Sequence, residues 1–349
     1  MIGLIWLILA LVALTLLLHV AARLLYVSPT ARLLGPTPWL PAEPHEPLEE
    51  GQAVEFATDD GLRLRGTYLP TTAPRRHGVI ACCHEFNGDR WNTVPYVNDL
   101  RQRGFDVFTF DFRNHGASDR TPGYQPTCWV TTYEVADVRA AVDYLCSRHD
   151  VPPQGIGLFG VGKGATAALC AAADEPRVGS LVIDGACPVR RMQIHHTRRI
   201  LDRYLGRARR LLPVPNGVLG LLGAWSRWVI GRRHRCRFVD VDRTARRLRQ
   251  PVLLIHGERD AHTPPELVRS LCDSIPGDAS LWVVPLARQD RAIHVAGKEY
   301  RRRTTAFFLR HLSADLPWNR SPQAFRVPRA AGGAAGSNGA VVPRRVSPA

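Results

Sequence analysis

The pattern of apolar positions along the chain predicts buried strands that alternate with helices. Two strands of alternating polarity, 53–57 and 62–69, meet at Asp60-Gly61, which is a strong hairpin-turn signal. Six short apolar runs then suit strands that are buried on both faces: 79–83, 107–112, 156–159, 181–184, 252–256 and 281–284. Helical segments separate most of these runs. The pattern therefore predicts an α/β fold with a mostly parallel central sheet and helices on both of its faces.

The first apolar run has a different character, because residues 2–22 carry no formally charged side chain. Such a run can span roughly 30 Å of hydrocarbon and exceeds the apolar region of a signal peptide. We therefore expect a transmembrane anchor over 2–27, with a cleaved signal peptide as the alternative. Arg23 and Arg32 follow the run, so the positive-inside rule predicts a single-pass membrane protein whose globular part faces the cytoplasm. A spacer rich in Pro and Glu is expected at 28–51.

The remaining chain divides by composition. We expect the core of the fold at 52–188 and 250–312, interrupted by a helical cap insertion at 189–249. The net charge is +15, and the cap segment alone holds 17 arginines and three acidic residues. Arginines in this density are attracted to anionic lipid headgroups, so a membrane is the expected partner; no recognised motif supports nucleic-acid binding. Residues 313–349 lack periodicity and predict a disordered basic tail.

A glycine-rich turn between a strand and a helix is the candidate centre of the chemistry. Gly160, Gly162 and Gly164 have the spacing of the G-x-S-x-G nucleophile elbow. The middle position is glycine, which has no side chain to attack a substrate. The stretch also follows the G-x-x-x-x-G-K-[ST] pattern of a phosphate-binding loop up to Lys163, but a glycine stands where a hydroxyl must bind Mg²⁺. A nucleotide site is therefore the weaker interpretation of this turn.

Four ordered motifs make the chain resemble the α/β-hydrolase superfamily, specifically its serine hydrolases and dienelactone-hydrolase-like members, which are often attached to membranes. The motifs are HEFNG at 84–88, DFRNHGAS at 111–118, the elbow, and HGERD at 256–260. The resemblance covers roughly 52–312 and implies an oxyanion loop at the first motif. The residues that it places around the cleft are Glu85, Phe86 and Lys163.

The resemblance also implies positions for a catalytic triad, in which a hydroxyl attacks, an imidazole removes its proton and a carboxylate orients the imidazole. Asp260 stands at the position of the triad acid. Gly162 stands at the nucleophile position, and Gln289 stands at the histidine position. Glycine has no side chain that could attack a substrate, and glutamine cannot act as a general base near neutral pH. His294 follows five residues later and is an alternative base if the loop is shifted.

These substitutions predict a catalytically degenerate serine hydrolase that keeps a cleft for a small acyl- or ester-like ligand or for a partner. No cofactor and no metal are expected. The alternative is an active ester or amide hydrolase that uses His294 with Asp260 and a non-standard nucleophile. Cys82, Cys83 and Cys187 lie near the expected loops and are the candidate thiols.

Overall fold

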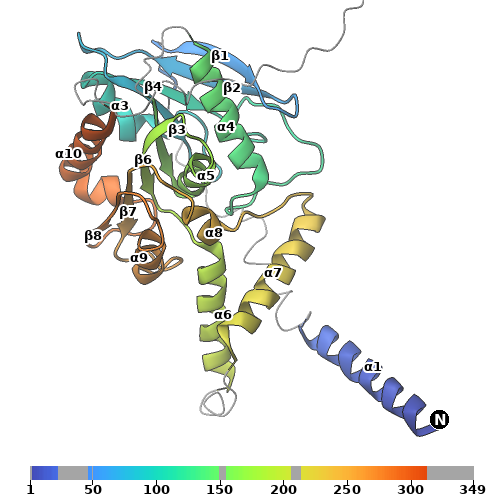
Figure 1. The fold of residues 1–349 in the computed structure, drawn as a ribbon. Coiled ribbons are helices and arrows are strands. Elements are labelled where there is room, and N and C mark those ends of the chain that lie inside the picture. Colours follow the sequence, from blue (N-terminus) through green and yellow to red (C-terminus); the bar gives the residue numbers. More distant parts are fainter. Residues whose placement is uncertain (1, 23–45, 49, 149–154, 206–213, 313–349) are drawn as a thin grey trace, which may run out of the picture. The chain divides into compact units, whose positions relative to one another are not determined.

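The computed structural model describes residues 2–22, 46–48, 50–148, 155–205 and 214–312. An eight-stranded sheet with the order β1-β2-β4-β3-β5-β6-β7-β8 forms the centre of the fold (Figure 1). The strands are β1 (Gln52–Ala57), β2 (Arg63–Leu69), β3 (Gly78–Cys83), β4 (Phe105–Phe110), β5 (Ile156–Val161), β6 (Val178–Asp184), β7 (Val252–Gly257) and β8 (Ala279–Val284). β2 pairs antiparallel with β1 and with β4, and every other neighbouring pair is parallel. The expected mostly parallel sheet is confirmed.

Helices cover both faces of this sheet, as the alternating strands and helices predict. The helices of the core are α3 (Val94–Gln102), α4 (Thr132–Ser147), α5 (Gly162–Ala172), α9 (Pro265–Cys272) and α10 (Ala292–Leu312). Side chains of a strand point alternately to its two faces. In β3, Val79 and Ala81 accordingly join the core with α4, α5 and α9, whereas Ile80 joins the core with α3 and α10. The sheet therefore separates two apolar layers.

The segment between β6 and β7 is helical over its described residues. It forms α6 (Val189–Leu205), α7 (Asn216–Arg233) and α8 (Val241–Ala245), and α6 packs against both of the others. An ion pair between Arg191 and Asp242 joins α6 to α8. Residues 237–239 then pair through the backbone with residues 130–132, where α4 begins. The arginine-rich cap segment is thus tied to the core at its carboxyl-terminal end.

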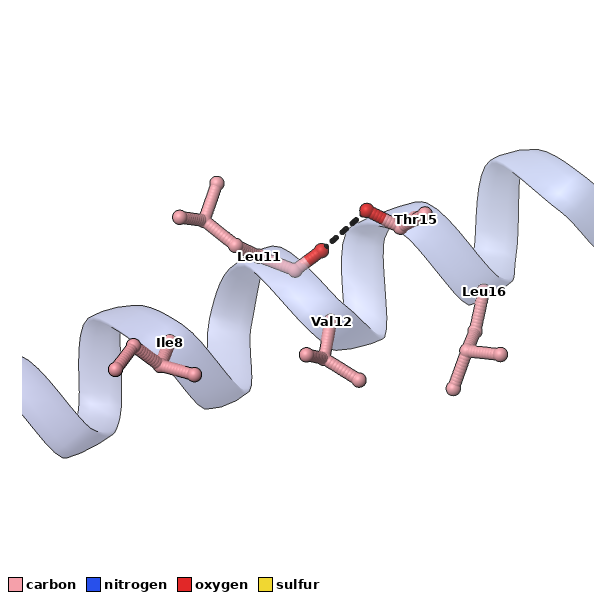
Figure 2. Close-up of a pocket in the computed structure, with 5 residues that line it drawn as sticks. All are labelled: Ile8, Leu11, Val12, Thr15 and Leu16. Atoms are coloured by element: carbon pink, nitrogen blue, oxygen red, sulfur yellow. Dashed lines mark hydrogen bonds between the residues drawn. The ribbon is translucent and has the colours of Figure 1, made fainter.

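α1 (Ile2–Ala22) is a helix whose described side chains are exposed and almost entirely apolar. Trp6 and Leu17 are 67% and 66% exposed. Figure 2 shows the side chain of Thr15 turned back along the helix, where its hydroxyl donates to the carbonyl oxygen of Leu11 at 2.7 Å. The internal hydrogen bond leaves this turn of the helix without an unpaired hydroxyl.

Over the described part of the chain, no helix combines the length and the hydropathy that crossing a membrane requires. The transmembrane helix expected at 2–27 is therefore not found. Arg23, Arg32, nearly all of the spacer and the tail at 313–349 lie outside the described residues.

Candidate active site

The glycine-rich turn has the geometry of a nucleophile elbow. β5 ends at Val161 and α5 begins at the next residue, Gly162, whose φ of 53° lies in the left-handed region that glycine tolerates. The flanking glycines permit close packing of the backbone. A Cβ on Gly164 would lie 2.2 Å from the carbonyl oxygen of Cys83, and one on Gly160 would lie 2.5 Å from the Cα of Ala165. The turn therefore requires small residues on both sides of position 162.

A carboxyl group occupies the space next to the elbow. A Cβ on Gly162 would lie 3.1 Å from Oδ2 of Asp290 and 3.4 Å from the Cβ of Glu85. Gly185, which follows β6, leaves room for the same carboxyl, because a Cβ there would lie 2.5 Å from Oδ1 of Asp290. Gln289 was expected at the histidine position, but the side chain that reaches the elbow belongs to the following residue. Sequence reasoning missed Asp290, and the only signal was an acidic residue beside Gln289.

Burial and like charge both disfavour ionisation of this carboxyl group. Burial raises the pKa of Asp290 well above its usual range, and the carboxyls of Asp184, Glu85 and Asp260 raise it further. Its Oδ1 is buried without a hydrogen-bond partner, although the residue as a whole is partly exposed. Burial also raises the pKa of Asp184 to about 7, despite a 2.9 Å hydrogen bond donated by the hydroxyl of Tyr300. Burial and the neighbouring carboxyls therefore favour the protonated form of Asp290 over its carboxylate.

These acidic residues are not arranged as metal ligands. Among the residues that the structure describes, no group of three or more His, Cys, Asp or Glu side chains could hold a metal ion.

Asp260 lies in the loop after β7 and is engaged by that loop. Its Oδ1 accepts hydrogen bonds from the backbone N–H groups of His262 at 2.7 Å and Thr263 at 2.9 Å. Its Oδ2 lies 3.6 Å from Nε2 of His256, and this ring nitrogen is 2.7 Å from the carbonyl oxygen of Thr263. The carboxylate at the expected acid position thus closes a turn.

The side chain of Lys163 points into a buried polar network. Its ammonium lies 2.8 Å from Glu134, which also accepts hydrogen bonds from the hydroxyl of Tyr124 and from the backbone N–H and hydroxyl of Thr131. Burial by itself would raise the pKa of Glu134, but the charge of Lys163 and these hydrogen bonds lower it overall. The ring of Phe86 covers the ammonium at 5.5 Å from its centroid. An amine held in this way is not directed at a phosphate, so the nucleotide interpretation gains no support.

His84 and His115, in the loops after β3 and β4, are neutral and form hydrogen bonds with backbone groups. Nε2 of His84 accepts from the N–H of Phe112 at 3.1 Å, so Nδ1 carries the proton that is donated to the carbonyl oxygen of Glu85 at 2.7 Å. Burial lowers the pKa of His84 to about 4 and that of His115 to about 3. His294 lies exposed in the first turn of α10. The side chains nearest to the elbow glycine are carboxyls instead of an imidazole.

The candidate thiols have the character of core residues. Cys82 and Cys83 are buried in β3, and burial raises the pKa of both. Cys187 lies 3.3 Å from the hydroxyl of Thr263, and burial also raises its pKa. Because the thiolate is the reactive form, none of the three is an activated nucleophile.

The fold agrees with that of known proteins. The family described as "alpha/beta hydrolase fold" matches residues 78–212. The solved structure of the Pyrococcus furiosus esterase Pf2001 superposes with a TM-score of 0.59 at 20% identity, covering 80% of this chain and 98% of that one. The chain has the alpha/beta hydrolase fold.

The curated sequence relatives match a smaller part of this chain than the solved structure does. An uncharacterized protein of Escherichia coli O157:H7, YfhR, is 29% identical over 164 residues, which are 46% of this chain and 52% of that protein. The thiohydrolase aneE of Aspergillus aculeatus is 32% identical over 137 residues, 39% of this chain and 41% of that protein. The chain spans about half the length of the curated relatives it matches. Of these two relatives, aneE is named as a thiohydrolase and YfhR is uncharacterized.

Proposed function

We propose that the protein is a catalytically degenerate member of the hydrolase fold, which binds a small acyl- or ester-like ligand or a partner without cleaving it. One observation carries the proposal: the carboxyl of Asp290 fills the space beside Gly162. The elbow has no nucleophilic side chain, and burial raises the pKa of the Asp290 carboxyl, which disfavours the carboxylate that would accept a proton from an attacking group. Both chemical functions of an acyl-transfer site are therefore missing at the elbow.

The alternative is an active ester or amide hydrolase that uses His294 with Asp260. It has less support, because His294 is exposed on α10 and Asp260 is engaged in its own loop. Burial also keeps the candidate thiols protonated. No described contact favours this alternative.

Labelling with a fluorophosphonate probe tests the proposal on the unaltered protein. We expect no labelling and no turnover of short-chain nitrophenyl esters, because the probe requires an activated hydroxyl. Esterase activity that disappears in His294→Ala, or in an alanine variant of Cys82, Cys83 or Cys187, would establish the alternative.

We further propose that α1 and the cap segment attach the protein to a membrane, with the folded core on the cytoplasmic side. The exposed apolar side chains of α1, such as Trp6 and Leu17, support attachment. The excess of arginine at 189–249 supports contact with anionic headgroups. Protease should digest the core only after lysis of intact cells. A soluble form trimmed near Ala22 would contradict attachment through α1.

A further inference from the structure

α7 exposes apolar side chains on the face that a surface helix normally fills with polar ones. Leu219, Gly223 and Ile230 are buried on one side. On the other side, Val218, Leu221 and Trp228 are 44%, 74% and 57% exposed. Residues three, four or seven apart share a helix face, and Val218, Leu221 and Trp228 are separated by three and by seven residues, so the three side chains form one apolar stripe. The stripe extends roughly 15 Å along the helix axis.

The stripe leads into a basic cavity at the carboxyl-terminal end of α7. The cavity measures about 490 Å³, and its lining includes Trp228 together with Arg227, Arg232 and Arg237. Phe238 adds a second aromatic wall. This volume lies in the range of ligand sites in proteins. A site with several guanidinium groups beside aromatic rings suits a ligand that is anionic at one end and apolar at the other.

Several of these side chains are held in place before any ligand binds. Arg227 donates a hydrogen bond to the side chain of Gln193, which is buried in α6. The guanidinium of Arg232 lies 4.9 Å from the centroid of the Trp228 ring. The backbone of Arg237 is fixed by a 2.9 Å hydrogen bond from the N–H of Thr132. Because contacts restrain the guanidinium groups of Arg227 and Arg232, the cavity loses less entropy when it binds an anion.

One acidic residue also lines the cavity. Asp240 accepts a hydrogen bond from the backbone N–H of Arg243 at 3.2 Å and caps α8. Its Oδ1 therefore faces the start of that helix. Three guanidinium groups against one carboxylate leave the cavity with a positive balance.

We propose that this cavity binds the headgroup phosphate of an anionic phospholipid whose acyl chain lies along the stripe of α7. The proposal rests on the membrane attachment proposed above and identifies one site for it. Guanidinium groups bind phosphate oxygens through paired hydrogen bonds. Tryptophan is enriched at the boundary between headgroups and acyl chains, which is the position that Trp228 would hold between cavity and stripe.

Binding of short-chain lipids by the full-length protein in a neutral detergent tests this site. Dioctanoyl phosphatidylglycerol is the anionic probe, and dioctanoyl phosphatidylcholine and inorganic phosphate are the comparison probes. We expect the anionic lipid to bind more tightly than either of the others. Arg232→Gln with Arg237→Gln should weaken it roughly 30-fold, since each surface arginine contributes about 1 kcal/mol. Trp228→Ala should weaken binding of the lipid more than it weakens binding of phosphate, because the lipid loses its apolar contact as well as the support that the ring gives to Arg232.

A matched control separates the site from the general charge of the segment. Arg246 and Arg249 are exposed arginines near α8 that do not line the cavity. Replacing both with Gln removes the same charge and should leave lipid binding unchanged. An equal loss in this control, or equal binding of the neutral lipid, overturns the proposal. Phosphate binding as tight as lipid binding overturns the assignment to lipid. Because detergent surrounds α1 in every variant, failure of the site is distinguishable from failure of the α1 attachment, which cell fractionation measures.

Discussion

At the scale of single residues, the candidate site is defined by what stands beside Gly162. The left-handed φ of this residue retains the turn on which a nucleophile would be displayed. Asp290, with a φ of 52°, places its carboxyl between Gly162 and Gly185. A carboxyl there excludes an imidazole from the same volume. The loss of the nucleophile and the loss of the base are therefore two features of one local arrangement.

The position of Asp290 predicts which histidine variant restores chemistry. Gly162→Ser combined with Asp290→His should give fluorophosphonate labelling and ester turnover roughly 10²-fold above either single variant, because a general base contributes about that factor. Gly162→Ser with Gln289→His should remain inactive, since the side chain at 289 is not the one that reaches the elbow. Circular dichroism would confirm that all variants fold. Greater activity in the Gln289→His pair would assign the histidine position to residue 289.

The buried carboxyl of Asp184 predicts a dependence of stability on pH. Its pKa is raised to about 7, so between pH 4 and 7 the folded protein binds a proton that the unfolded chain releases. The wild-type protein therefore loses stability, relative to Asp184→Asn, as the pH rises through this window. Across this window, the difference in unfolding free energy between the wild type and Asp184→Asn changes by at most about 4 kcal/mol. Tyr300 can still donate its hydrogen bond to the Asn oxygen.

Urea unfolding of both proteins at pH 4.5 and pH 7.5 measures this difference. The comparison with the variant is needed because the lowered pKa values of His84 and His115 act in the opposite direction in both proteins. A difference in unfolding free energy that is the same at the two pH values would show that Asp184 is ionised throughout.

At the scale of elements, α4 and α5 are joined across the site by one buried ion pair. Thr131 caps α4, and its capping box brings Glu134 into the first turn of that helix. Lys163 stands in the first turn of α5, directly after the elbow. Their ion pair is fully buried, with side-chain exposures of 1% and 0%. The turn at Gly162 is therefore held by contacts between helices as well as by the strand.

Removing the charge of Lys163 should destabilise the fold strongly. Lys163→Met leaves the carboxylate of Glu134 buried without its cation, and such losses amount to about 3–5 kcal/mol. Lys163→Met combined with Glu134→Gln should recover most of that loss, because Gln can still accept the hydrogen bond from Thr131 and carries no charge. Chemical unfolding of the two variants and the wild type measures both values. A double variant as unstable as Lys163→Met would show that the charge is not what destabilises it.

At the scale of the whole molecule, basic charge is concentrated in one insertion. The cap segment holds 17 arginines and three acidic residues, whereas the net charge of the entire chain is +15. The rest of the protein is therefore almost neutral. A field confined to one segment favours a single orientation against an anionic surface.

This distribution predicts salt-sensitive binding to membranes even without α1. A chain lacking residues 1–27 should sediment with vesicles that contain phosphatidylglycerol at low salt, and should be released as salt is raised, because ions screen exposed charges. Vesicles of phosphatidylcholine should bind little of it. Equal binding to both kinds of vesicle, or to neither, would rule out an electrostatic role for the cap segment.

Local patterns in the sequence were sufficient to predict the strands, the helices and the elbow. The apolar runs identify strands buried on both faces, because only such strands lack an alternating polar side. The spacing of Gly160 and Gly164 identifies the turn, since the close approach of backbone at both positions admits no side chain. The absent nucleophile at Gly162 follows from the same three positions. All of these features depend on residues that are close together along the chain.

Only the tertiary structure decided which side chains meet at the elbow. Glu85, Gly162, Gly185 and Asp290 follow four different strands, β3, β5, β6 and β8. The parallel sheet brings the carboxyl ends of these strands to one edge, and the conformation of each loop then sets where its side chains point. A shift of one residue in the loop after β8 decides between Gln289 and Asp290. The spacing of residues along the chain does not determine which of the two side chains reaches the elbow, because that depends on the packing of loops that are distant in sequence.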